Sequence, residues 1–224
     1  MSSKPKTIGL ANGDAISGLW LKPADAKAVL VLAHGAGAGM THKSMEAIAE
    51  GLAERKIATL RFNFLYMERG SNRPDSPAIA EGAVRAAVAE GAKLAANLPL
   101  FAGGKSFGGR MTSGAQAKEA LPKVAGLVFF GFPLHPAGKP GVERAKHLAE
   151  VKVPLLFLSG SNDALAELDL LRPTVKKLGA GAKLAVFANA DHSFHVPAKT
   201  GKKDPEVLAE ILDTARDWML SQID

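Results

Sequence analysis

Gly104-Lys105-Ser106-Phe107-Gly108 stands between an apolar stretch, Leu98 to Ala102, and a stretch of small residues with helical spacing, Met111 to Ala120. In a G-x-S-x-G pattern the serine occupies a sharp turn from a strand to a helix, and the glycines leave room beside its hydroxyl. The same letters also suit a glycine-rich turn whose serine caps the next helix. The rest of the chain has to distinguish a reactive serine from a structural one.

Length and composition favour a single α/β domain that spans residues 1–224. Hydrophobic residues make up 47% of the 224 residues, which is enough for a continuous core. No apolar run approaches the roughly 18 residues of a membrane span, and the first seven residues lead into no apolar signal region. We therefore expect a cytoplasmic protein without a membrane partner.

The chain has no cysteine, so it can form neither a disulfide framework nor a thiolate nucleophile nor a Cys-based zinc site. Its net charge is +6, but the basic residues are scattered, and the densest cluster is Lys199, Lys202 and Lys203. We expect a solvated surface and no nucleic-acid partner. Lys105 and the loop from Lys199 to Lys203 are also compatible with an anionic ester, although solvated lysines are the simpler interpretation.

Hydrophobic patterning predicts eight strands. Thr7 to Leu10 and Ala15 to Leu21 are joined through Asn12-Gly13, which favours an antiparallel hairpin. Six apolar runs suited to buried parallel strands follow: Ala28 to Leu32, Ile57 to Phe62, Leu98 to Ala102, Val124 to Phe130, Pro154 to Leu158 and Lys183 to Phe187.

Stretches with helical spacing lie between these strands: Lys43 to Glu54, Ala78 to Ala96, Met111 to Ala120, Val142 to Glu150, Leu165 to Leu178 and Pro205 to Ser221. This alternation predicts an α/β fold with an eight-stranded, mostly parallel sheet and helices on both faces. In such folds ligands bind at the carboxyl ends of the strands.

An acid and a histidine follow later strands in a suitable order. Asp163 stands in the turn after the seventh predicted strand, and His192 stands in the turn after the eighth. Ser106 itself follows the fifth. The chain order Ser106, Asp163, His192 is the nucleophile, acid, base order of the α/β-hydrolases. We therefore expect these three residues to form a catalytic triad.

Other histidines and acids are weaker candidates. His195 is offset from the strand end by three positions, and Glu167 and Asp169 fall inside a predicted helix. His34 is expected to orient its loop. The remaining histidines, His42, His135 and His147, are expected at the surface or in packing.

Two nucleotide-binding motifs each lack a required glycine in this sequence. A Walker A loop requires glycine five positions before Gly104, where Pro99 stands. A Rossmann turn starting at Gly35 requires its third glycine where Met40 stands, and the next strand ends without an acid. An NADP-dependent oxidoreductase that uses Arg61 for the phosphate is the least favoured alternative.

The chain resembles the α/β-hydrolases of the small, dienelactone-hydrolase-like kind over nearly its full length. Three motifs carry the resemblance: His34 to Gly39 after the third predicted strand, the Ser106 turn, and the Asp163 and His192 turns. Arg61 to Phe64, Arg73 to Asp75 and Gly104 to Arg110 further resemble a poorly characterised hydrolase-like group of bacteria and eukaryotes, some of whose eukaryotic members belong to regulatory complexes.

This resemblance implies a serine hydrolase of carboxylesterase type that needs neither cofactor nor metal. The backbone N–H groups of Ala36 and Phe107 would form its oxyanion hole. Dienelactone hydrolases use cysteine where Ser106 stands, so their lactone substrate is not carried over. The expected substrate is a small ester or thioester. The alternative is a catalytically idle scaffold that serves as a protein-interaction module.

Only the segment from Phe132 to Lys152 is available for a cap after the sixth predicted strand, so we expect a minimal cap and an open, shallow site. Candidate lining residues, of which at least half would serve the core or surface instead, are Phe64, Tyr66, Met67, Phe132, Leu134 and Phe194.

Overall fold

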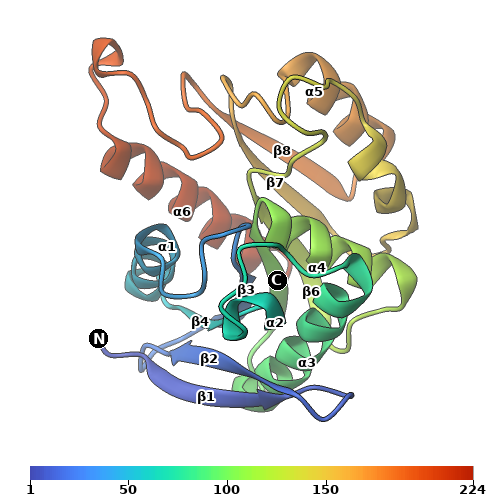
Figure 1. Cartoon of the computed structure of the whole chain (residues 1–224). Coiled ribbons are helices and arrows are strands. Elements are labelled where there is room, and N and C mark those ends of the chain that lie inside the picture. The colour runs from blue at the N-terminus through green and yellow to red at the C-terminus, as the bar shows by residue number, and fades with distance from the viewer. Residues whose placement is uncertain (224) are drawn as a thin grey trace.

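The computed structural model describes residues 1–223, which form an eight-stranded sheet in the order β1-β2-β4-β3-β5-β6-β7-β8 (Figure 1). The strands are β1 (Lys4–Gly9), β2 (Ala15–Leu21), β3 (Ala28–Ala33), β4 (Ile57–Phe62), β5 (Leu100–Lys105), β6 (Val124–Phe130), β7 (Leu155–Gly160) and β8 (Ala182–Phe187). β2 pairs antiparallel with both β1 and β4, and every other pairing is parallel. The predicted eight-stranded, mostly parallel sheet is confirmed.

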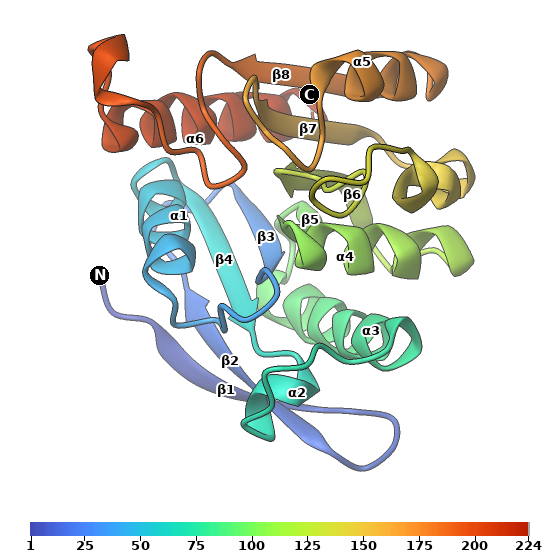
Figure 2. The same ribbon diagram turned by 45° about the horizontal axis from the view of Figure 1, so that its top comes forward.

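Helices cover both faces of this sheet, as Figure 2 shows. Their bounds are α1 (Lys43–Glu54), α2 (Leu65–Glu68), α3 (Pro77–Ala95), α4 (Phe107–Lys118), α5 (Leu168–Lys177) and α6 (Asp204–Ser221), with 3₁₀ turns η1 (Glu143–Glu150) and η2 (Ala198–Thr200). α1 and α6 contribute to one buried apolar cluster, and α3, α4 and α5 contribute to another. Within residues 1–223, no helix combines the length and the apolar character that a membrane crossing requires.

Regular secondary structure extends further into the glycine-rich run than the sequence predicts. β5 continues to Lys105, three residues past the expected end, and α4 begins at Phe107 instead of Met111. A Cβ at Gly103 would overlap the backbone of Val128, and one at Gly104 would overlap Ala33. The absence of side chains at these two glycines therefore allows close packing around β5 and the start of α4. Ser106 is the single residue of the turn between these two elements.

Four other segments differ from the prediction. The residues from Glu143 to Glu150 form a 3₁₀ helix and not an α-helix. α5 begins at Leu168, not Leu165, because the Leu165 N–H bonds the Asp163 side chain in the preceding turn. The short α2 and η2 were not predicted; at four and three residues they are too short to show a helical period.

Candidate active site

Ser106 occupies the turn between β5 and α4 in a strained conformation, with φ of 51° and ψ of −113°. Its N–H donates to the Phe130 carbonyl at 3.2 Å, which ties the turn to β6. The loop after β3 lies directly alongside, because a Cβ on Gly35 would be 3.8 Å from the Ser106 Cβ. A positive φ at a residue other than glycine persists only where its surroundings fix it, and here the neighbouring strands do so.

Ser106, His192 and Asp163 form a continuous chain of hydrogen bonds. The distance between Ser106 Oγ and His192 Nε2 is 2.8 Å, and the distance between His192 Nδ1 and Asp163 Oδ2 is also 2.8 Å. A carboxylate can only accept, so Nδ1 carries the ring proton and Nε2 accepts from the serine hydroxyl. A serine, imidazole and carboxylate linked this way can transfer the hydroxyl proton during nucleophilic attack.

Backbone contacts hold the acid and base in place. The buried Asp163 also accepts the Leu165 N–H through Oδ1 at 2.8 Å. Lys105 donates from Nζ to the His192 carbonyl at 3.0 Å, and its ammonium lies 5.0 Å from the centre of the Phe194 ring. Burial lowers the pKa of Lys105, while the negative charges of Asp163 and Asp191 act in the opposite direction.

His34 orients the loop that faces Ser106, as its position predicted. The Phe64 N–H donates to His34 Nε2 at 3.1 Å, so Nδ1 carries the proton and donates to the Gly35 carbonyl at 2.7 Å. The Tyr66 hydroxyl accepts the Gly37 N–H at 2.9 Å. The loop next to the serine is therefore fixed by side chains from the segment after β4.

Burial lowers the pKa of His34 below the ordinary histidine value of 6.5, so protonation of this ring opposes folding. Between the lowered pKa of the folded chain and pH 6.5 the unfolded chain binds more protons than the folded chain, so stability falls with falling pH by at most about 1.4 kcal/mol per unit. His34→Gln keeps an acceptor for the Phe64 N–H but has no imidazole to protonate. We expect the stability of this variant to depend less steeply on pH. Urea unfolding of both proteins between pH 7.5 and 5.5 measures this difference, and equal slopes would contradict it.

A pocket of about 320 Å³ opens beside the serine. Its lining residues are Ala36, Pro74, Asp75, Pro77, Ser106, Phe107, Arg110, Pro133, Arg144 and Leu165. Phe107 is the first residue of α4, so its N–H has no acceptor within the helix. Ala36 and Phe107, whose N–H groups the sequence predicted as an oxyanion hole, thus line the same pocket as the serine.

The expected aromatic lining is wrong. Phe64, Tyr66, Phe132 and Leu134 are buried in the apolar cluster under α3 and α4. Met67 packs against that cluster, and Phe194 lines a different hollow, next to Lys105. The pocket wall instead comes from other residues in the segments that follow β3, β4, β5, β6 and β7, and neither Lys105 nor the Lys199 to Lys203 loop contributes to it.

Two lining residues, Arg110 and Arg144, were not predicted as site residues. Arg110 follows the serine by four positions on α4, so helical spacing could have placed it on the same side as the Ser106 turn. Arg144 lies in η1, 38 positions after Ser106, and no local spacing connects it to the serine.

The competing histidines and acids have other partners. His195 is exposed and bonds Asp204 at 2.9 Å, and a carboxylate oxygen of Glu167 lies 2.6 Å from His135 Nε2. His147 bonds the Ser113 hydroxyl at 2.7 Å. His42 accepts the Ser44 N–H at the start of α1, and Asp169 is exposed in the first turn of α5. These contacts account for the histidines and acids that the triad leaves out.

Arg61 has hydrogen-bond partners within the protein. Arg61, the candidate phosphate contact, is buried and donates to the Met40 carbonyl at 2.9 Å and to the Ser3 hydroxyl at 3.2 Å. Within residues 1–223, no three His, Asp or Glu side chains converge in a way that could hold a metal ion.

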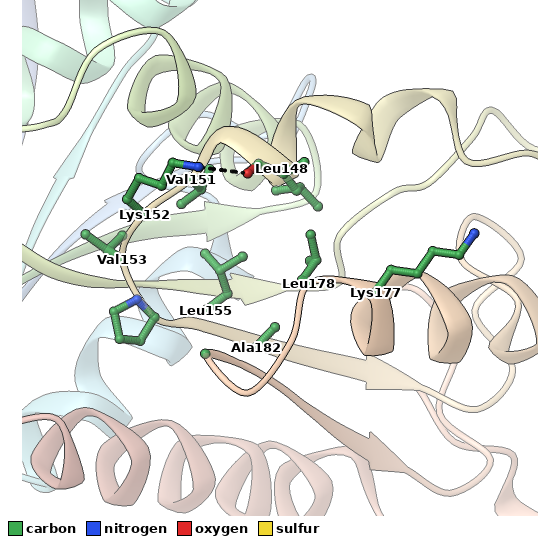
Figure 3. A pocket seen from close by; sticks show the side chains of 11 residues that line it. Leu148, Val151, Lys152, Val153, Leu155, Lys177, Leu178 and Ala182 are labelled. Atoms are coloured by element: carbon green, nitrogen blue, oxygen red, sulfur yellow. Dashed lines mark hydrogen bonds between the residues drawn. The ribbon is translucent and has the colours of Figure 1, made fainter.

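A second hollow of about 340 Å³ lies at the amino ends of β7 and β8, shown in Figure 3. Aliphatic side chains such as Leu148, Val151 and Leu178 line it, together with Lys152 and Lys177. Asp163 and His192 follow the carboxyl ends of the same strands. This hollow is therefore at the opposite edge of the sheet from the serine.

Known structures share this architecture. The chain superposes on a dienelactone hydrolase from Anabaena variabilis with a TM-score of 0.77 at 20% identity, covering 98% of this chain and 97% of the other. An α/β serine hydrolase without lid from Xanthomonas campestris gives 0.74 at 19% identity over 97% and 95%. Est1E from Butyrivibrio proteoclasticus gives 0.72 at 16% identity over 100% and 99%.

The sequence itself carries a family signature over most of its length. Residues 26–220 match the family described as an alpha/beta hydrolase domain. This match spans the serine, acid and histidine turns as well as the loop after β3. The chain therefore belongs to the alpha/beta hydrolase domain family.

Proposed function

We propose that this protein is a serine hydrolase that cleaves a carboxylic ester or thioester through an acyl-serine intermediate. The hydrogen-bonded chain from Ser106 through His192 to Asp163 is the observation that carries the proposal. Ser106 lines a pocket in which a substrate could bind, whereas a serine with a purely structural role requires no pocket beside it. Several structural neighbours are described as esterases, among them an esterase domain from Rhodothermus marinus.

The first half of the reaction forms the acyl-serine. Ser106 Oγ attacks the carbonyl carbon while His192 Nε2 accepts the hydroxyl proton. The N–H groups of Phe107 and Ala36 stabilise the negative oxygen of the tetrahedral intermediate. When that intermediate collapses, His192 returns its proton to the departing alcohol or thiol, and Asp163 stabilises the imidazolium in between.

The second half of the reaction consumes one water. His192 accepts a proton from the water as its oxygen attacks the acyl-serine, and the carboxylic acid leaves when Ser106 Oγ regains that proton. Because the segment between β6 and β7 contributes only loops and η1, the pocket has no covering domain among the described residues. We therefore expect short or exposed acyl groups to be favoured over long lipid chains.

Covalent labelling tests the proposal. The protein is treated with a fluorophosphonate, the label is located by mass spectrometry, and a panel of short-chain aryl esters is assayed alongside. We expect a label on Ser106 and measurable turnover of the short esters. If no label forms and no ester is cleaved, the proposal is wrong, and the idle scaffold becomes the better description. Turnover restricted to long-chain lipids would contradict the expected open site.

A further inference from the structure

Two arginines stand together in the wall of the pocket next to Ser106. Both Arg110 and Arg144 are half-buried, and both belong to the lining. Burial lowers the pKa of each guanidinium, and the positive charge of Arg144 lowers the pKa of Arg110 further. Two desolvated like charges oppose each other unless an anion lies between them.

The surroundings of Arg110 are unfavourable for a guanidinium group in two other respects. It stands in the first turn of α4, where the partial positive charge of the helix terminus disfavours a cation. Its Nε is buried and has no hydrogen-bond partner within residues 1–223, while its guanidinium lies 5.9 Å from the centre of the Phe107 ring. A buried donor without an acceptor costs about 1–3 kcal/mol. The Nε–H group of Arg110 therefore has no acceptor within the described residues, and a bound ligand could supply one.

Nearby carboxylates do not neutralise the pair. In the hollow that adjoins the two arginines, Glu81 bonds Lys118 at 2.5 Å and Glu143 bonds Lys146 at 2.6 Å. Glu150 borders the same hollow but is exposed to solvent. No carboxylate among the described residues offsets the fall in the pKa of either arginine.

Asp75 is the acidic member of the catalytic pocket, and its Oδ2 already accepts the Tyr66 N–H at 3.0 Å. Two guanidinium groups and one carboxylate leave a single net positive charge in the lining. A singly charged carboxylate balances that charge, whereas a doubly charged phosphate would exceed it and would be repelled by Asp75. Guanidinium groups also match the planar geometry of a carboxylate.

We propose that Arg110 and Arg144 form a carboxylate-binding subsite, so that the preferred substrate is an ester that carries a free carboxylate within a few bonds of the scissile carbonyl. The pocket of about 320 Å³ is small enough to keep both groups of such a substrate in one place. This inference rests on the proposed hydrolase function and adds the chemical class of its substrate.

Matched substrates test the subsite. Monoethyl succinate, glutarate and adipate are each compared with the corresponding half amide, which has the same shape without the charge. We expect the wild-type protein to favour the charged member in kcat/KM for at least one length. Arg144→Gln and Arg110→Gln are each expected to lower the charged-to-neutral ratio by about tenfold to hundredfold, the range for hydrogen bonds to charged groups. Arg172→Gln removes an exposed positive charge elsewhere and is expected to keep the ratio.

Binding to the Ser106→Ala protein supplies a second measurement that needs no turnover. We expect calorimetry to detect monoethyl adipate, and we expect Arg144→Gln in that background to weaken its binding by a similar factor. Wild-type cleavage of neutral esters with equal charged-to-neutral ratios in all proteins would overturn the subsite alone. Binding without any cleavage would overturn the hydrolase function and keep the subsite. Tighter binding of ethyl 4-phosphonobutanoate than of the monoethyl esters would overturn the assignment of a carboxylate.

Discussion

Ser106→Ala is expected to lower kcat for a short-chain aryl ester by about 10³-fold or more while the protein stays folded. Without Oγ no acyl-serine can form, and water must attack the substrate directly. The residual rate would come from the pocket, the two N–H groups of Ala36 and Phe107, and His192 acting on water. The methyl side chain fits where the Ser106 side chain lies, so we expect the circular dichroism spectrum and the melting temperature to change little.

The same experiment shows whether the three side chains act as one unit. His192→Ala is expected to lower kcat by about as much as Ser106→Ala, and the double variant is expected to be no slower than either single variant. Asp163→Asn should lose somewhat less, because the imidazole remains but its preferred tautomer is no longer held. If the losses in kcat were additive, the three side chains joined by hydrogen bonds of 2.8 Å would not operate as a triad.

Ser193→Ala is the matched control, since Ser193 is an exposed serine directly after His192. It should keep wild-type turnover and labelling. If Ser106→Ala retains more than a tenth of the wild-type kcat after the spontaneous rate is subtracted, the acyl-serine mechanism is wrong. If Ser106→Ala unfolds, labelling of the wild-type serine still decides the question.

The sheet and the hydrogen-bonded chain at its edge could be predicted because each depends on local patterns. Strand-like runs of four to seven residues, most of them separated by stretches with helical spacing, were enough to count the strands. Since parallel strands end at one edge of the sheet, polar residues after the fifth, seventh and eighth strands had to lie close together. The structure adds the distances and the tautomer of His192, which spacing does not contain.

The pocket lining could not be predicted in the same way. Aromatic residues near the site, such as Phe64 and Phe132, are as suitable for a core as for a pocket, and packing places them in the core. Arg144 lines the pocket of Ser106 from η1, whose position depends on the loop after β6, so its place in the lining is a tertiary effect. Arg110 and Arg144 come together only in the folded chain, so the proposed carboxylate subsite cannot be predicted from spacing.

The glycines beside Ser106 were predicted to relieve crowding, and the structure shows how large that crowding is. The first turn of α4 packs directly on the end of β3: a Cβ on Gly108 would lie 2.5 Å from the Ala33 carbonyl oxygen and 2.6 Å from that of His34. Both obstacles are backbone atoms, which no change of rotamer can move. The helix must therefore shift away from the loop that contains Ala36, and Ser106 shifts with it.

We expect Gly108→Ala to destabilise the protein by about 3 kcal/mol, since insertion into close packing forces backbone movement. The corresponding fall in melting temperature is roughly 6–12 °C for a chain of this size. Turnover by the folded fraction should also drop, by about tenfold to hundredfold, because a shift near 1 Å misaligns the serine and the oxyanion donors. Calorimetric melting and ester assays below the transition measure the two effects separately.

Gly82→Ala isolates the cause of these losses. Gly82 also lies inside a helix, α3, but it is exposed, and a Cβ there would meet nothing within 4 Å. Alanine should stabilise that helix by about 0.5–1 kcal/mol through its higher propensity and leave turnover unchanged. The two substitutions are chemically identical, so opposite signs of stability change would show that contact with β3 makes glycine necessary at position 108. A stable, fully active Gly108→Ala protein would mean that the close packing of α4 on β3 does not hold Ser106 in position.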